Sequence, residues 1–117
     1  MTDWTDWNAR REHLGTAIGN YASLSPDTVS AVLALNGAGE KTGHLDAKTR
    51  ELIALAVAAT TRCDGCITIH AAEAAKAGAT RDEIGEALSV AIALNAGAAL
   101  VYSTRILDAF DEVKKNI

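Results

Sequence analysis

The 117-residue chain has little of what breaks helices or builds disulfide scaffolds: one proline, two cysteines and five aromatic side chains. Proline is the strongest helix breaker and alanine the best helix former, so one proline and 24 alanines indicate helices. A chain of this length can bury a core large enough to fold without a disulfide or a metal. We therefore expect a single domain over residues 1–117, all-α, with about five or six helices.

The chain also lacks an excess of basic residues, having 11 Lys and Arg against 15 Asp and Glu, for a net charge of −4. This balance argues against a nucleic-acid partner, and no cationic helix suits an anionic membrane. The apolar run at residues 52–59 is far too short to span a bilayer. Residues 1–7 have neither the positive nor the apolar region of a signal peptide. We expect no nucleic acid, no membrane and a cytoplasmic location.

Periodicity and capping residues predict helices over residues 2–21, from 26 to the glycines at 37 and 39, and over 47–61, 63–77, 81–94 and 98–115. Asp46 suits an N-cap, and Thr80 with Glu83 forms a capping box. The segment 95–97, which contains Gly97, is predicted to separate the last two helices. Residues 52–59 are apolar all round, which favours burial against another subunit.

The two cysteines stand three positions apart in Cys63-x2-Cys66, a spacing that in a reducing compartment indicates catalysis or metal binding. Cys63 lies near a helix N-terminus, where the helix dipole lowers a thiol pKa. His70 follows Cys66 by four residues and Cys63 by seven, so all three share one helix face. A histidine exchanges protons near neutral pH and can serve both thiols. Glu51, on the preceding helix, is the candidate that orients the imidazole.

A metal-binding or assembly module is the alternative that these residues leave open. Zinc could take the two cysteines with His70 and Glu51, but structural zinc sites usually draw on two CxxC-type halves, and this chain has one. Two small residues that merely pack in a helix are a further alternative. We expect no metal and no cofactor.

The pattern Glu51-x11-Cys63-x2-Cys66-x3-His70 resembles the core motif of the AhpD-like alkylhydroperoxidases, within the carboxymuconolactone decarboxylase superfamily. Residues 45–56, 77–84 and 98–102 resemble that family too, and the likeness covers about residues 26–110. It implies an all-α fold with a core helical hairpin, assembled as a homo-oligomer, either trimer or hexamer. It further implies thiol-dependent reduction of a hydroperoxide substrate.

In the roles that this resemblance implies, Glu51 and His70 form a proton relay. Cys66 attacks the peroxide and becomes a sulfenic acid, and Cys63 resolves it to a disulfide. A dithiol reductant, such as a lipoamide-bearing protein, then reduces the disulfide. The fullest peroxidase members carry a second histidine just before the second cysteine, where this chain has Gly65. A cofactor-free acid–base lyase, as in the decarboxylating branch, is the alternative function, and it would not need the cysteines.

Overall fold

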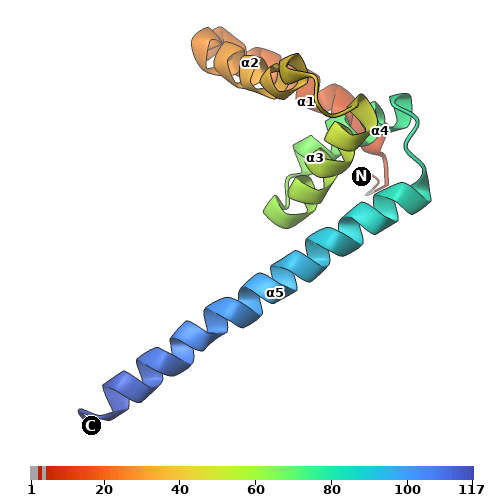
Figure 1. Ribbon diagram of the computed structural model, residues 1–117. Helices are drawn as coiled ribbons and strands as arrows, with labels where there is room; N and C mark the ends of the chain where they lie inside the picture. The colour runs from red at the N-terminus through yellow and green to blue at the C-terminus, as the bar shows by residue number, and fades with distance from the viewer. Residues whose placement is uncertain (1–2, 4) are drawn as a thin grey trace.

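The computed structural model describes residue 3 and residues 5–117, and its elements are five helices with no strand among the described residues. They are α1 (Trp7–Leu24), α2 (Pro26–Thr42), α3 (Ala47–Thr61), α4 (Asp64–Lys76) and α5 (Arg81–Lys114) (Figure 1). The predicted all-α class is confirmed.

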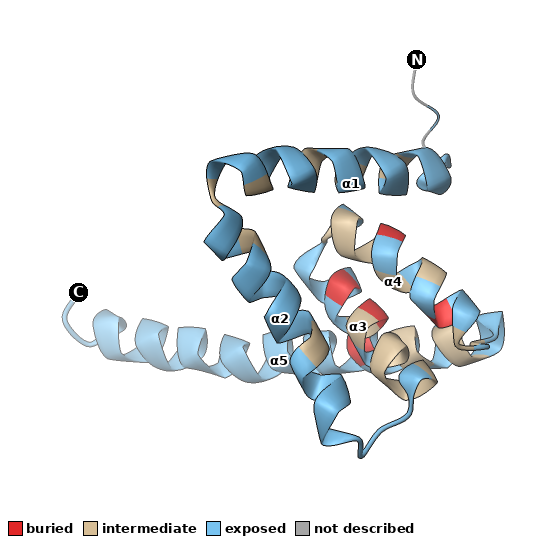
Figure 2. Ribbon diagram, turned by 90° about the horizontal axis from the view of Figure 1, so that it is seen from above, coloured by how far each residue is buried: buried red, intermediate tan, exposed pale blue. Residues whose placement is uncertain are grey.

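The packed part of the molecule is built around α3, which lies against both α4 and the first half of α5. Helix α1 packs on α2 and on α4. The buried apolar residues are few and mostly small: Leu55, Ala58, Ala74 and Ala91 (Figure 2). They lie on α3, α4 and α5, and three of the four are alanines, which let helix backbones approach closely.

The predicted helix starts around that pair are confirmed by hydrogen bonds. The Asp46 side chain accepts the Thr49 amide at 2.8 Å and caps α3. The Thr80 hydroxyl accepts the Glu83 amide at 3.1 Å, and the Glu83 carboxylate accepts the Thr80 amide at 2.9 Å. Gly78, at φ +84°, follows α4 in the left-handed conformation that glycine adopts without steric cost.

Two predicted helix boundaries are wrong. Helix α2 runs through both glycines at 37 and 39 and ends at Gly43, which has φ +72°. The last two predicted helices are one, because α5 is continuous through residues 95–97. The side-chain amide of Asn95 donates to the Ala91 carbonyl at 2.7 Å, so its polar group is satisfied inside the helix.

The first helix also begins later than predicted. Asp6 caps α1 by accepting the Ala9 amide at 3.0 Å, and the helix starts at Trp7. The beginning of the predicted 2–21 helix, including Trp4, falls partly outside the described residues.

The chain is elongated because the second half of α5 projects away from the other helices (Figure 1). Every residue from Ile92 to the C-terminus is exposed. The radius of gyration is 19.3 Å, against about 13 Å for a compact chain of this length. By length and composition α5 also qualifies as a membrane span, the single helix to do so among the described residues.

Candidate active site

The two cysteines lie where α3 turns into α4. Arg62 ends α3 in the left-handed conformation at φ +56°, and the Cys63 amide donates back to the Ala58 carbonyl at 3.1 Å. This tight turn places Cys63 at the N-cap of α4, and Cys66 in the first turn of that helix. Both cysteines are free thiols and half-buried.

Cys63 is surrounded by hydrogen-bond donors. The Cys66 amide donates to the Cys63 sulfur at 3.2 Å, as an N-cap side chain accepts from the first turn. Hydrogen bonds from the Cys66 thiol and then from the Cys66 amide lower the pKa of the Cys63 thiol. The nearby Asp64 charge opposes this by raising the same pKa, a contribution that sequence reasoning missed.

The pKa of the Cys66 thiol is shifted in the opposite direction. Its hydrogen bond to the Cys63 sulfur, its burial and the negative charge of Cys63 all raise the pKa of the Cys66 thiol. The two cysteines therefore shift in opposite directions: the pKa of the Cys63 thiol is lowered and that of the Cys66 thiol is raised. The family resemblance, by contrast, assigns the attacking role to Cys66.

Glu51 and His70 meet across the contact between α3 and α4. The Glu51 Oε2 atom lies 2.7 Å from the His70 Nδ1 atom, and both side chains are half-buried. An ionised carboxylate only accepts hydrogen bonds, so Nδ1 carries the proton and Nε2 is left as the acceptor in the neutral ring. His70 lies one helical turn after Cys66 on the same face of α4. The structure thus pairs Glu51 with His70 and Cys63 with Cys66, and one turn of α4 separates Cys66 from His70.

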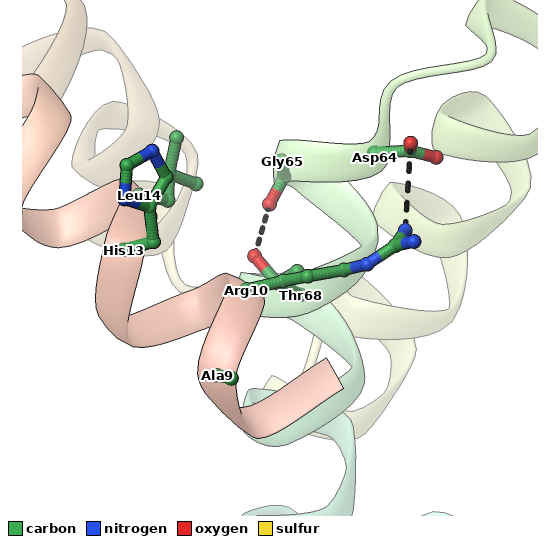
Figure 3. Close-up of a pocket in the computed structure, with 7 residues that line it drawn as sticks. All are labelled: Ala9, Arg10, His13, Leu14, Asp64, Gly65 and Thr68. Carbon is green, nitrogen blue, oxygen red and sulfur yellow. Dashed lines mark hydrogen bonds and ion pairs between the residues drawn. The ribbon is translucent and has the colours of Figure 1, made fainter. Parts of the chain in front are cut away.

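A cavity of about 630 Å³ lies beside the first turns of α4. It opens between α1 and the first turns of α4, where the Arg10 guanidinium lies 3.7 Å from the Asp64 carboxylate (Figure 3). It is lined by Ala9, Arg10, His13, Leu14, Asp64, Gly65 and Thr68. None of the four candidate residues lines it, but Asp64 and Gly65, which stand between the two cysteines, do.

Helix α1 meets the cysteine segment at Gly65. A β-carbon added at Gly65 would lie 3.1 Å from Leu14 Cδ2, which is closer than most such contacts. Leu14 therefore occupies the space that a side chain at position 65 would need. The periodicity of α1 pointed to a helix but carried no signal for this contact.

The described residues do not supply a ligand set for the alternative of a zinc site. Within the part of the chain that the structure describes, no three or more His, Cys, Asp or Glu side chains converge as metal ligands would.

The protein is an all-helical one that carries a CxxC segment and a Glu–His pair on neighbouring helices. Comparison with known sequences shows the family to which it belongs. The Carboxymuconolactone decarboxylase family matches residues 26–109. The chain belongs to this family, and the predicted resemblance is confirmed.

Similar proteins cover nearly the whole chain. A solved carboxymuconolactone decarboxylase family protein from Legionella pneumophila has a TM-score of 0.70 and 34% identity, covering 91% of this chain and 95% of that one. An uncharacterized protein of Haemophilus influenzae is 50% identical over 95% of this chain and 98% of its own length. The uncharacterized protein 4 in the cox locus of Paracoccus denitrificans is 38% identical, with coverages of 83% and 87%.

Proposed function

We propose that the protein is a thiol-dependent oxidoreductase that reduces hydroperoxides, or exchanges disulfides, through Cys63 and Cys66. The observation that carries this proposal is the 2.7 Å contact between Glu51 and His70, one turn from Cys66. A histidine held in one tautomer by a carboxylate is the arrangement that moves protons to and from a nucleophile. The family membership supports the proposal, since the same four residues carry the resemblance to the AhpD-like alkylhydroperoxidases.

The proposed cycle oxidises the dithiol once per peroxide. One hydroperoxide and the two thiols give an alcohol, water and an intramolecular disulfide. A sulfur at the N-cap and a second sulfur in the first turn of the same helix suit this step, because a CxxC forms its disulfide with little backbone movement. A dithiol reductant, for which a lipoamide-bearing protein is our candidate, restores the thiols. The proposed location is the cytoplasm, where reducing thiol pools keep such pairs reduced.

Stopped-flow mixing of the reduced protein with a hydroperoxide tests the proposal, with dihydrolipoamide as reductant. We expect one equivalent of peroxide to be consumed rapidly per chain and both thiols to disappear. The matched controls are Cys63→Ser and Cys66→Ser, which we expect to abolish turnover. Full peroxide consumption by both variants would refute the proposal.

A cofactor-free lyase remains the competing activity within the same family. It would use Glu51 and His70 as acid and base and would not require sulfur. Decarboxylation of a lactone acid by a variant with both cysteines replaced by serine would favour the lyase over the redox enzyme. We expect no such activity.

We also propose that copies of the chain assemble through α5. The accessible surface is 9227 Å², about 3,100 Å² more than the roughly 6,100 Å² expected for a folded monomer of 12.2 kDa. One standard interface covers about 800 Å² per partner. The excess therefore corresponds to several such interfaces, as a trimer or hexamer would supply.

The face of α5 that packs on α3 continues, uncovered, along its second half. It is one stripe of positions three or four residues apart, beginning at half-buried Ile84 and Leu88 and buried Ala91 and ending with exposed large side chains. The exposed part includes Tyr102, Ile106, Phe110 and Val113.

A second copy fits this stripe better than a lipid bilayer does. Four charged residues lie between the apolar positions of the last turns: Arg105, Asp108, Asp111 and Glu112. Burying such charges in a membrane is costly. An amphipathic stripe packed against a protein partner leaves them in water.

A further inference from the structure

We propose that Arg10 of α1 is a positioning residue of the cysteine site, because it holds the Asp64 carboxylate and offsets its negative charge beside Cys63. The purpose of this pairing rests on the proposed redox function, since only a thiol pair that reacts needs its reactivity adjusted. The first helix would in this way regulate a site to which it contributes no sulfur.

Asp64 is the negative charge that the pairing offsets. It directly follows Cys63 and is the first residue of α4. A nearby negative charge disfavours a thiolate. Hydrogen bonds from the Cys66 thiol and amide lower the pKa of the Cys63 thiol most, and the Asp64 charge acts against them by raising it. A cation that pairs with this carboxylate therefore favours the Cys63 thiolate.

Arg10 is the cation that the fold brings to this carboxylate. Its Nη1 atom lies 3.7 Å from the Asp64 Oδ2 atom, at the cavity between α1 and α4 (Figure 3). The guanidinium also lies over the ring of Trp7, one turn earlier on α1, at 4.6 Å from the ring centroid. The Arg10 side chain is 22% exposed and the Asp64 side chain 71%. The arginine is thus packed on α1, which limits where its charge can lie.

The packing of α1 on α4 sets how near Arg10 comes to the pair. Leu14, one turn after Arg10, lies beside Gly65, where an added β-carbon would be 3.1 Å from its Cδ2 atom. The ion pair and this apolar contact therefore join α1 to two consecutive residues of α4, Asp64 and Gly65. If α1 left α4, Asp64 would lose its counter-ion, so the reactivity of Cys63 is coupled to the position of α1.

The other charged and titratable groups around the pair stay the same when Arg10 is changed. Arg62 is the C-cap of α3, directly before the pair. His13 of α1 lines the same cavity as Asp64, and Glu51 and His70 pair with each other. A difference between Arg10 variants is therefore measured against one electrostatic background.

The exposure of Asp64 bounds the size of the effect. Water weakens an ion pair with so exposed a partner, and such pairs change an equilibrium by at most about fivefold. We therefore expect loss of the Arg10 charge to slow the reaction of Cys63 at neutral pH by about two- to fivefold. Salt screens exposed charges, so the difference should shrink at high ionic strength.

Alkylation of the reduced, full-length chain by iodoacetamide over a range of pH, with Cys63 followed by peptide mapping, tests the coupling. Arg10→Met should move the midpoint to higher pH and leave the alkaline plateau rate unchanged, because the thiolate is fully formed there. A change in packing or accessibility alone would alter the plateau instead. Arg10→Lys keeps the charge and should restore most of the rate at neutral pH.

Arg11, the next residue on α1, provides the matched control. Its guanidinium donates to the Asn8 side chain at 3.4 Å, and within the described part of the chain it forms no ion pair. Arg11→Met removes the same charge from the same helix, so its alkylation profile should match that of the wild type. Slowing by Arg11→Met as large as that by Arg10→Met would show a general effect of net charge and overturn the inference.

Asp64→Asn decides whether Arg10 acts through Asp64. This variant should move the Cys63 midpoint to lower pH, and adding Arg10→Met to it should have no further effect, since no carboxylate remains to be offset. Equal slowing by Arg10→Met with and without Asp64, or no slowing in either, would overturn the inference. Failure of the wild type to consume peroxide or exchange a disulfide would overturn the proposed function instead, because alkylation depends on neither reaction.

Discussion

The absence of a side chain at Gly65 makes a quantitative prediction about α1. Leu14 Cδ2 lies 3.1 Å from where a β-carbon at position 65 would stand, so the change Gly65→His must push Leu14 away. Overpacking costs about 1–3 kcal/mol, and the loss of a half-buried leucine contact costs about 1 kcal/mol. We expect Gly65→His to lower the free energy of unfolding by about 2 kcal/mol. The imidazole should displace α1 from α4 and leave the turn at the cysteines in place.

Equilibrium denaturation followed by circular dichroism, with Trp7 fluorescence reporting on α1, measures this cost. Gly65→Ala is the matched control, because Leu14 needs to shift by only a few tenths of an ångström. Alanine's helix propensity, up to about 1 kcal/mol better than glycine's, offsets the crowding. We expect this control to unfold within about 0.5 kcal/mol of wild type.

The double variant Leu14→Ala/Gly65→His decides the cause. If the two side chains compete for one space, removing the leucine makes room for the imidazole. The combined loss is then smaller than the sum of the single losses by about 1 kcal/mol. Strict additivity, or a Gly65→His variant as stable as wild type, would refute the described packing of α1 on α4.

Three further predictions concern the relay, the thiol and the assembly. Glu51→Gln should reduce steady-state peroxide turnover by about 100-fold with a stability loss of about 1 kcal/mol; an unchanged rate would remove Glu51 from the mechanism. In the wild type, iodoacetamide should alkylate Cys63, identified by peptide mapping, with a pH midpoint below that of an ordinary thiol, since hydrogen bonds from the Cys66 thiol and amide hold its pKa down. Because this pKa is lowered in the folded state, the associated stabilisation is present above the pKa of an unfolded thiol and is lost as the pH falls through the lowered value; a midpoint at or above the ordinary one would contradict this. Ile106→Glu with Phe110→Glu should convert an oligomer into monomers in light scattering after gel filtration, whereas a wild type that is monomeric, or that partitions into vesicles, would contradict assembly through α5.

Local signals in the sequence predicted the part of the fold that holds the site. Asp46 and the Thr80–Glu83 capping box fixed two helix starts, because a cap is formed by residues three positions apart. The pairing of Glu51 with His70 was expected for a different reason: a carboxylate on an otherwise apolar helix needs a partner, and the histidine lay in register with the cysteines.

The predictions that failed depended on packing. The segment at Asn95 contains residues that often end helices, yet its side chain bonds within α5, and the sequence alone does not show which option the chain takes. The contact of Leu14 with Gly65 joins residues 51 positions apart, and no local pattern encodes it. The rise in the Cys63 thiol pKa that the Asp64 charge causes likewise depends on the geometry of the turn.

The contact between Glu51 and His70 joins α3 and α4, whose buried residues are Leu55, Ala58, Thr68 and Ala74. Ala74, one turn beyond His70 on α4, is fully buried at 0% exposure. A change of packing too small to unfold the chain would lengthen the 2.7 Å contact and break the relay. Under the proposed mechanism, activity would then decline before stability does.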